Sequence, residues 1–217
     1  MPKQEKVLVI ARNVLEQVGL FNGLEFDVDR FLDKMFARDS VFFMDRTRAE
    51  DDPQYKQIIP YVLIKSENSF LTYVRGKRAG ESRLVGHRSV GIGGHINPVD
   101  DMPLLDTDYY NTYLTAVDRE VREEISIDTD YKNHTIALIN DDSNPVGKVH
   151  LGIIHCFDLD QPAVTKREQM ITQLEFMKPA QLRELKNEME SWSALCIDHI
   201  PRIRERLDSA PRPDLKH

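Results

Sequence analysis

The sequence predicts an α/β protein, and three observations lead to that fold class. Short runs rich in valine and isoleucine recur along the chain, as is typical of β-strands. Between about 107 and 125, apolar residues follow one another at steps of four and three, the spacing of an amphipathic helix. A glycine-rich turn at 89–98 precedes that helix. These features predict a sheet combined with helices over about 57–189.

Length and composition limit what kind of protein this is. The chain has 217 residues, which suits one domain with appendages. Hydrophobic residues make up 41% and charged residues 30%, the balance of a globular protein. No apolar run approaches the length of a membrane span and no secretory leader follows Met1, so we predict a cytoplasmic protein without a membrane partner. The net charge of -7 argues against broad nucleic-acid binding, which depends on a basic surface.

The first part of the chain, residues 1–55, is predicted to be an extension that packs on a core at 56–190. The extension is expected to contain strands at 6–10 and 41–43 and helices at 11–19 and 28–36, the last with Asp27 as its N-cap. Its apolar residues favour simple packing, while a contribution to a substrate pocket or to a dimer interface stays open. Two strands, at 57–65 and 69–75, follow it.

A basic segment at 75–88 separates these strands from the glycine turn. It holds five lysines and arginines and a single acid, Glu81. A solvated hairpin explains this pattern as well as anion recognition does. Candidate substrate-binding residues are Arg75, Arg83 and Arg88. If they bind substrate, charge reversal at Arg83 or Arg88 should raise the Michaelis constant far more than it alters the fold.

Three carboxylates lie within one helical turn at the end of the predicted helix. Glu120 and Glu124 are four residues apart and Glu123 is three from Glu120, so all three can converge on one point. Each pair of like charges costs roughly 1–4 kcal/mol at such distances, and a divalent cation would reverse that sign. The alternative is a solvated helix face on which Arg119 and Arg122 neutralise the glutamates.

The sequence R-E-V-R-E-E-I-S-I, which begins at Arg119, resembles the second half of the Nudix box when it is read together with Gly94. The box runs glycine, five residues, glutamate, seven residues, then R-E-U-x-E-E-x-G-U, where U is a bulky aliphatic residue. This sequence departs from it in having Asp100 for the glutamate, a longer gap before Arg119, and Ser126 for the late glycine. An insertion at 101–110 explains the gap without moving the helix.

The resemblance to Nudix hydrolases implies an α/β/α sandwich with a mixed sheet. It implies hydrolysis of a diphosphate linkage, usually in a nucleoside diphosphate joined to another group. It also implies Mg2+ or Mn2+ held by Glu120, Glu123, Glu124 and the carbonyl of Gly93, with Arg119 orienting the glutamates. Asp100 is one methylene shorter than the family's glutamate, and Asp101 or Asp106 could take its place.

Later segments add one more candidate acid. Strands are predicted at 131–139, 149–159 and 173–177, followed by a helix with Pro179 in its first turn and a helical C-terminal segment at 191–217. Many Nudix proteins place a catalytic or metal-binding acid in the loop before the last strand. Glu168 is the first candidate for that role and Glu175 the second. His95 is better explained as a supporting residue than as a ligand, because magnesium sites seldom use imidazole.

Two other classes of protein share parts of this sequence pattern. An isopentenyl diphosphate isomerase needs a catalytic cysteine and a histidine-rich metal site, but Cys156 and Cys196 lie outside the box and the histidines do not cluster. Both cysteines sit in apolar patterns and are predicted to be buried thiols. A non-catalytic Nudix-like module that binds a ligand also stays open. A homodimer is compatible with the resemblance, since homodimers are frequent in the family.

Overall fold

A computed structural model describes residues 5–76, 86–100, 108–167 and 171–209. The chain divides into two compact units, each assembled from three separate stretches. Unit 1 comprises Met1–Tyr61, Gly93–Val121 and Ala137–Ile154, and unit 2 comprises Val62–Ile92, Arg122–Ile136 and His155–His217. The predicted division at 1–55, 56–190 and 191–217 concerns the order along the chain, and this spatial division does not test it.

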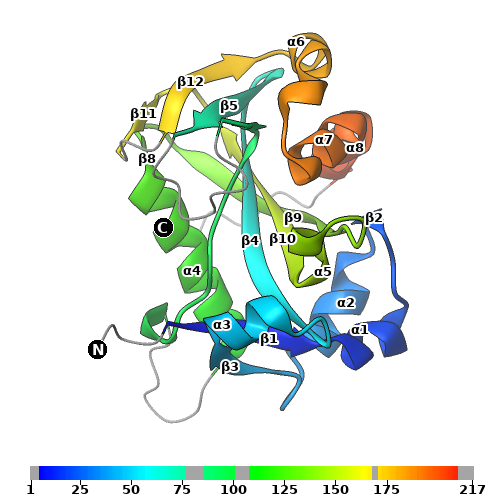
Figure 1. Cartoon of the computed structure of the whole chain (residues 1–217). Coiled ribbons are helices and arrows are strands. Elements are labelled where there is room, and N and C mark those ends of the chain that lie inside the picture. Colours follow the sequence, from blue (N-terminus) through cyan, green and yellow to red (C-terminus); the bar gives the residue numbers. More distant parts are fainter. Residues whose placement is uncertain (1–4, 77–85, 101–107, 168–170, 210–217) are drawn as a thin grey trace. The chain divides into compact units, whose positions relative to one another are not determined.

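The main sheet has its strands hydrogen-bonded in the order β12-β5-β4-β10-β9-β2 (Figure 1). Their bounds are β2 Gly23–Glu25, β4 Tyr55–Ser66, β5 Ser69–Arg75, β9 Tyr131–Asn140, β10 His150–Leu159 and β12 Ile171–Met177. Shorter strands join at β1 Lys6–Ala11, β3 Val41–Asp45, β6 Arg88–Ser89 and β7 Gly91–Gly93, while β8 Ile125–Ile127 pairs separately with β11 Val164–Lys166. The α/β class with a mixed sheet is confirmed.

Unit 1 is built on β1, which pairs antiparallel with β3 and with β4. The four central residues of β1, 7–10, are all buried, as expected for a strand with neighbours on both edges. Its helices are α1 Arg12–Val18, α2 Val28–Met35, α3 Arg46–Asp51, α5 Pro145–Lys148 and most of α4 Tyr109–Glu124. In α2, the buried residues Val28, Phe31 and Met35 recur at helical spacing, which confirms the predicted amphipathic helix.

Unit 2 contains the β4–β5 hairpin and the C-terminal helices. Ser66 pairs with Ser69, so the hairpin loop has two residues. The helices are α6 Pro179–Glu184, α7 Ser191–Asp198 and α8 Ile200–Ser209. Pro201 lies in the first turn of α8, where a missing N–H costs no hydrogen bond, so the C-terminal segment forms two helices.

Helix α4 carries the Nudix-like sequence. Asp108 caps its start, because Oδ1 accepts hydrogen bonds from the N–H groups of Tyr110 and Asn111 at 3.0 and 3.1 Å. The helix ends at Glu124, and the chain continues directly into β8, where Ser126 pairs with Thr165. The exit from the helix is therefore a strand, which has no need of the left-handed glycine that the family places there.

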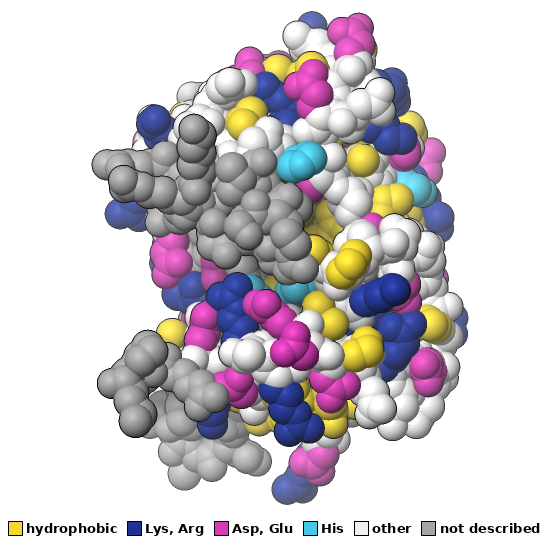
Figure 2. All heavy atoms as spheres, in the orientation of Figure 1, with side chains coloured by type: hydrophobic (Ala, Val, Ile, Leu, Met, Phe, Trp, Pro, Cys, Tyr) yellow, Lys and Arg dark blue, Asp and Glu magenta, His cyan; other side chains and the backbone are white. Residues whose placement is uncertain are grey.

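The surface and the cysteines agree with a globular protein of mixed charge. On the face shown in Figure 2, basic and acidic side chains are interspersed. Cys156 and Cys196 are both buried and free, which confirms the predicted buried thiols. No helix within the described residues is long and apolar enough to span a membrane.

Candidate active site

Gly94, the last residue of the glycine turn, makes room for the carboxylate of Glu120. A Cβ atom at Gly94 would lie 2.1 Å from Glu120 Oε2 and 2.6 Å from Oε1, so the carboxylate would have to move away. Glu120 is itself buried near the end of α4, with 9% of its surface exposed. The glycine therefore permits a carboxylate to approach the backbone of the turn closely.

Arg119 holds this carboxylate in place. Its Nη1 donates to Glu120 Oε1 at 2.8 Å, while Nε and Nη2 donate to the two oxygens of Asp100 at 2.6 and 2.9 Å. Nη2 also donates to the carbonyl oxygen of His95 at 2.9 Å. The hydrogen bonds to Asp100, together with the charge of Glu120, raise the pKa of the Arg119 guanidinium further above its ordinary value despite partial burial. Arg119 thus bridges the glycine turn and α4 as a permanent cation.

Asp100 is positioned by a short 3-10 turn at Pro98–Asp100. Its side chain is almost fully buried, and Oδ2 also accepts a hydrogen bond from the Asn97 N–H at 2.8 Å. The aspartate that replaces the family's glutamate therefore reaches Arg119 in spite of its shorter side chain. The other acids considered for this role, Asp101 and Asp106, lie outside the described residues.

Glu123 and Glu124 belong to unit 2 and lie on the last turn of α4. Glu123 is exposed and Glu124 is half-buried. The carbonyl of Glu124 accepts a hydrogen bond from the Arg167 N–H at 2.9 Å, and Arg167 Nη1 donates to the carbonyl of Arg122 at 2.9 Å. Arg167 thus caps the C-terminal end of α4, where a cation is favourable. Sequence reasoning missed Arg167, which directly precedes Glu168, a candidate that lies outside the described residues.

The donors near Gly94 suit a hard divalent cation. They are carboxylate and backbone carbonyl oxygens, which Mg2+ prefers. Because Gly94 has no side chain, the Glu120 carboxylate lies close to the backbone of the glycine turn. Among the described residues, no group of three or more His, Cys, Asp or Glu side chains is placed so that it could hold a metal ion. Mg2+ usually binds through one or two carboxylates, several waters and a substrate phosphate.

Two of the three candidate substrate-binding arginines are engaged by acids in unit 2. Arg88 is buried, with Nη1 3.3 Å from Glu175 Oε1 and Nη2 donating to Gln173 Oε1 at 3.0 Å. Arg75 Nε lies 3.4 Å from Glu190 Oε2. These contacts favour a structural role, and substrate binding by Arg75 and Arg88 stays a prediction. Arg83 lies outside the described residues.

A buried polar network holds the strand that leads into the glycine turn. Glu190 Oε1 accepts hydrogen bonds from the hydroxyls of Ser89 and Ser193 at 2.7 and 3.2 Å, and Ser193 Oγ accepts from the Val90 N–H at 3.0 Å. The hydroxyl of Tyr73 donates to the Gly91 carbonyl at 2.9 Å, and burial raises its pKa. Sequence reasoning missed this network, because its members are polar residues spread over the chain.

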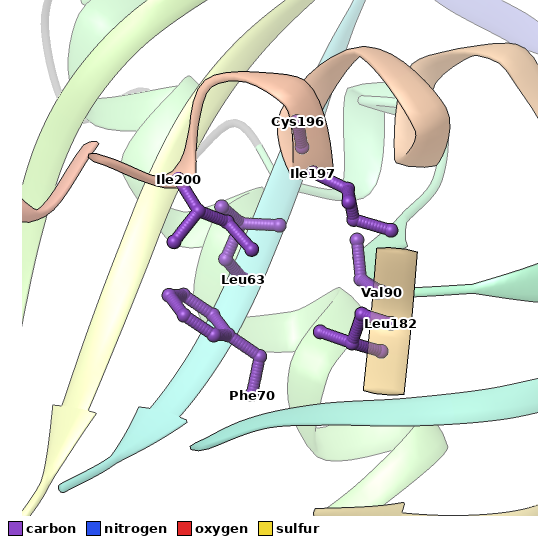
Figure 3. Close-up of a pocket in the computed structure, with 7 residues that line it drawn as sticks. All are labelled: Leu63, Phe70, Val90, Leu182, Cys196, Ile197 and Ile200. Carbon is purple, nitrogen blue, oxygen red and sulfur yellow. The ribbon is translucent and has the colours of Figure 1, made fainter. Parts of the chain in front are cut away.

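An apolar cavity in unit 2 is too small to be a ligand site. It is lined by Leu63, Phe70, Val90, Leu182, Cys196, Ile197 and Ile200 (Figure 3). Its volume is about 10 Å³, close to the minimum for one water molecule. Burial raises the pKa of the Cys196 thiol well above its ordinary value, so this cysteine is not a nucleophile.

Comparisons with known proteins define the class. Models of known protein families give no match. This chain resembles the crystal structure of Tm1382, a candidate Nudix hydrolase, with a TM-score of 0.74 and 27% sequence identity. The match covers 90% of this chain and 98% of the Tm1382 chain. The chain belongs to the Nudix hydrolase family, whose members act on phosphoric anhydride bonds.

A relative of this chain in sequence is protein YmaB of Bacillus subtilis (strain 168). It is 34% identical over 209 residues, which span 91% of this chain and 98% of YmaB. Two more distant structures share the fold. DR0079 of Deinococcus radiodurans has a TM-score of 0.52 at 14% identity, over 76% of this chain and 94% of its own. The Nudix domain of Shewanella oneidensis NrtR, complexed with ADP ribose, has a TM-score of 0.51 at 13% identity. That match covers 70% of this chain and 88% of the NrtR chain.

Proposed function

We propose that this protein is a metal-dependent hydrolase that cleaves a diphosphate linkage, in a nucleoside diphosphate joined to another group. The observation that carries the proposal is the placement of the Glu120 carboxylate, which Arg119 holds against the Gly94 backbone. The NrtR Nudix domain, which shares the fold, is complexed with ADP ribose, and this supports a nucleotide ligand.

Glu120, Glu123, Glu124 and the Gly93 carbonyl would hold Mg2+ or Mn2+. Helix α4 is continuous from Tyr109 to Glu124, so the three glutamates follow one another within about one helical turn. When bound, the cation neutralises charge on phosphate oxygens and lowers the pKa of the attacking water. The negative charge of Asp100 and Glu120 exceeds the positive charge of Arg119 between them, which favours cation binding.

The chain's own groups have separate parts in the proposed reaction. Arg119 fixes the rotamer of Glu120, and Asp100 in turn fixes Arg119. A carboxylate takes the proton of the attacking water, either one of the α4 glutamates or Glu168. Phosphate oxygens of the substrate would complete the oxygen shell of the cation. A cytoplasmic location and a homodimer stay predictions.

The test is turnover of a substrate panel with Mg2+ or Mn2+. The panel contains ADP-ribose, nucleoside diphosphate sugars, dinucleoside polyphosphates and nucleoside triphosphates, and the assay detects released phosphate-containing products. We expect one class to be hydrolysed, with activity lost on chelation and reduced by about 10²-fold or more in Glu123→Gln and Glu124→Gln.

A matched control is Glu184→Gln, which neutralises an exposed glutamate on α6. It should leave turnover unchanged. If the whole panel stays intact while Mg2+ still raises the melting temperature, the site binds an ion without hydrolysing these compounds. That outcome would replace the hydrolase with a ligand-binding module.

A further inference from the structure

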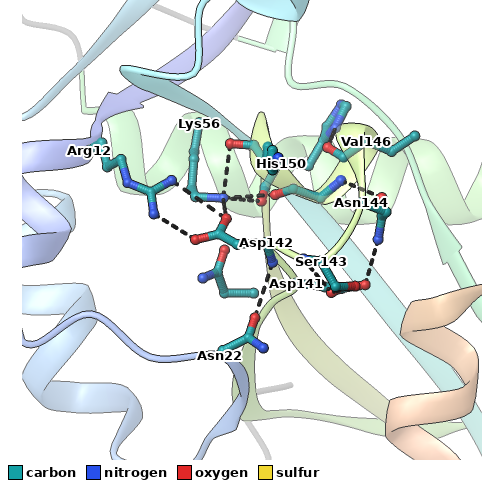
Figure 4. A network of polar contacts seen from close by, with 12 residues as sticks. Arg12, Asn22, Lys56, Asp141, Asp142, Ser143, Asn144, Val146 and His150 are labelled. Carbon is teal, nitrogen blue, oxygen red and sulfur yellow. Dashed lines mark hydrogen bonds and ion pairs between the residues drawn. The ribbon is translucent and has the colours of Figure 1, made fainter.

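The loop between β9 and β10, residues 141–149, is tied to β4 by a lysine with no exposed surface. The Nζ of Lys56 donates to Asp142 Oδ1 at 2.9 Å and to the carbonyls of Gly147, Lys148 and His150 at 2.7, 3.1 and 3.2 Å (Figure 4). Burial lowers the pKa of Lys56, and the hydrogen bond and charge of Asp142 oppose that shift. A buried ammonium is stable only with such partners, so its contacts define the conformation of the loop.

Asp142 connects the same loop to the N-terminal extension. Its Oδ2 accepts a hydrogen bond from Arg12 Nη2 at 2.6 Å, and its N–H donates to Asn22 Oδ1 at 3.0 Å. Burial of the Asp142 carboxyl tends to raise its pKa, but the hydrogen bonds from Arg12 and Lys56 outweigh it and lower the pKa overall. One carboxylate is thus shared by the extension, the loop and β4.

The loop in turn fixes the orientation of His150. The carbonyl of Val146 accepts a hydrogen bond from His150 Nδ1 at 2.7 Å, so Nδ1 carries the proton. Asn144 caps the helix α5 that contains Val146, with its side-chain oxygen accepting from the Gly147 N–H at 2.9 Å. The imidazole of His150 is therefore set by the loop backbone.

His150 contacts the glycine turn of the candidate active site. Its ring lies next to the ring of His95 in a tilted arrangement, with 5.9 Å between the centroids and 53° between the planes. The carbonyl of His95 accepts a hydrogen bond from Arg119, which holds Glu120. The extension also reaches this turn directly, since the Leu8 N–H donates to the carbonyl of Ile96 at 3.0 Å.

We infer that Arg12 and Asp142 are positioning residues, through which the N-terminal extension sets the glycine turn and Glu120 by way of the 141–149 loop and His150. The N-terminal extension then helps to set the geometry of the candidate active site. The expected effect on turnover rests on the proposed function, whereas the structural link between Arg12 and the glycine turn does not.

The experiment compares Arg12→Ala with Arg46→Ala by hydrogen exchange. Arg46 is a matched control, because it lies on the same extension, is similarly exposed at 28% against 25%, and pairs with Glu5 and Glu50 at 2.8 and 2.9 Å away from the loop. We expect Arg12→Ala to raise amide exchange several-fold in peptides covering 141–150 and 93–97, and Arg46→Ala to raise neither. Asp142→Asn should repeat the Arg12→Ala result.

Kinetics with the substrate found by the panel provide the second readout. Arg12→Ala should lower kcat up to about tenfold with a smaller change in KM, the lower end of the loss seen when a hydrogen bond to a metal ligand is removed. Arg12→Lys should recover part of the lost kcat, because lysine keeps the positive charge beside Asp142. The inference is overturned if exchange rises in 141–150 while 93–97 and kcat stay at the values of the unmodified protein. If no substrate is hydrolysed, the proposed function fails, and the exchange of 93–97 still decides the inference.

Discussion

Two arginine clusters, one in each unit, differ in their balance of charge. In the Arg119 cluster, one guanidinium faces the two carboxylates of Asp100 and Glu120, which leaves an excess of one negative charge. In the Arg88 cluster, one guanidinium faces one carboxylate, that of Glu175, and the neutral amide of Gln173. The charge balance of these pairs favours a cation more in the first cluster than in the second.

The two clusters also differ in how the backbone packs around them. Gly94 lies against the Glu120 carboxylate and leaves no space for a side chain. Arg88 instead lies on a strand that pairs with β5, and it contacts a bulge in β12 between Thr172 and Glu175. We propose that the Arg119 cluster is arranged for binding and the Arg88 cluster for stability, so substitutions should separate activity from unfolding free energy.

The largest effect is expected from Gly94→Ala. The new Cβ would displace the Glu120 carboxylate, which is the end of a flexible side chain, so the fold should survive. We expect kcat/KM to fall by about 10²-fold or more and the unfolding free energy to change by about 1 kcal/mol or less. Steady-state kinetics and urea unfolding measure the two quantities.

Gly93→Ala is the matched control for this substitution. Its Cβ would lie 2.3 Å from the backbone oxygen of Pro60, which cannot move without disturbing β4. We expect a loss of about 2–3 kcal/mol in unfolding free energy. If the two alanines had the same effect on stability, the assignment of Gly94 to the site rather than to packing would be wrong.

The second prediction concerns Arg88→Met. The buried methylene stem is kept, while the hydrogen bond to Gln173 and the ion pair with Glu175 are lost. We expect a loss of about 2 kcal/mol in unfolding free energy, with kcat and KM within about twofold of the unmodified protein. Arg183→Met, at an exposed position on α6, should change neither quantity. A raised KM with an intact fold would instead establish Arg88 as a phosphate ligand.

Periodicity predicted much of the fold, because local patterns decide where helices and strands form. The stripe of apolar residues placed α4 within about two residues of its observed bounds, Tyr109–Glu124. Its predicted burial is confirmed at Val117, Val121 and Ile125, but Leu114 is only half-buried and the prediction is wrong at Tyr110, which is exposed. The helix α5 was missed because it is a single turn inside a polar loop, made by the Asn144 cap and Pro145. A helix of one turn is too short for its apolar residues to show a helical periodicity in the sequence.

The candidate site was predictable in its residue types but not in its contacts. The R-E-x-x-E-E pattern singled out Arg119 and Glu120, which the structure brings together with Asp100. The acid that pairs with Arg88 is 87 residues away along the chain, and the one that pairs with Lys56 is 86 residues away. A run of basic residues in the sequence therefore cannot show whether its charges are free to bind a ligand.

The third prediction uses pH to test the stability of unit 2. His155 is almost fully buried, its Nδ1 lies 2.7 Å from Asn133 Oδ1, and burial lowers its pKa to about 4. The folded protein keeps this imidazole neutral at pH 5, while the unfolded chain binds a proton below pH 6.5. Stability is thus fully present above pH 6.5 and is lost as the pH falls toward 4.

We expect this histidine to account for about 2 kcal/mol of stability lost between pH 7.5 and pH 5. Urea unfolding at both pH values should show that His155→Gln lacks this loss. His134, whose pKa burial also lowers, is only half-buried, so His134→Gln should alter the pH dependence less. An unchanged pH dependence in His155→Gln would show that another group is responsible.

The smallest effect is expected at the β4–β5 hairpin, where stability should rise without any change in activity. Glu67 has a φ of 51°, and Ser66 pairs with Ser69, so Glu67 is the first residue of a two-residue loop. Glycine is favoured there, because a positive φ is strained for other residues. Part of that gain is offset by the flexibility that glycine adds to the unfolded chain. Glu67→Gly should therefore raise the unfolding free energy by about 0.5 kcal/mol.

Asn68→Gly is the control for the hairpin, because Asn68 has no positive φ to relieve. It should lower the unfolding free energy by about 0.5–1 kcal/mol through the unfolded chain alone. If the unfolding free energy rises in Glu67→Gly and falls in Asn68→Gly, the backbone conformation of the loop, rather than its composition, sets the stability of this hairpin. Both variants should keep the kcat/KM of the unmodified protein, since neither alters the balance of charge around Arg119.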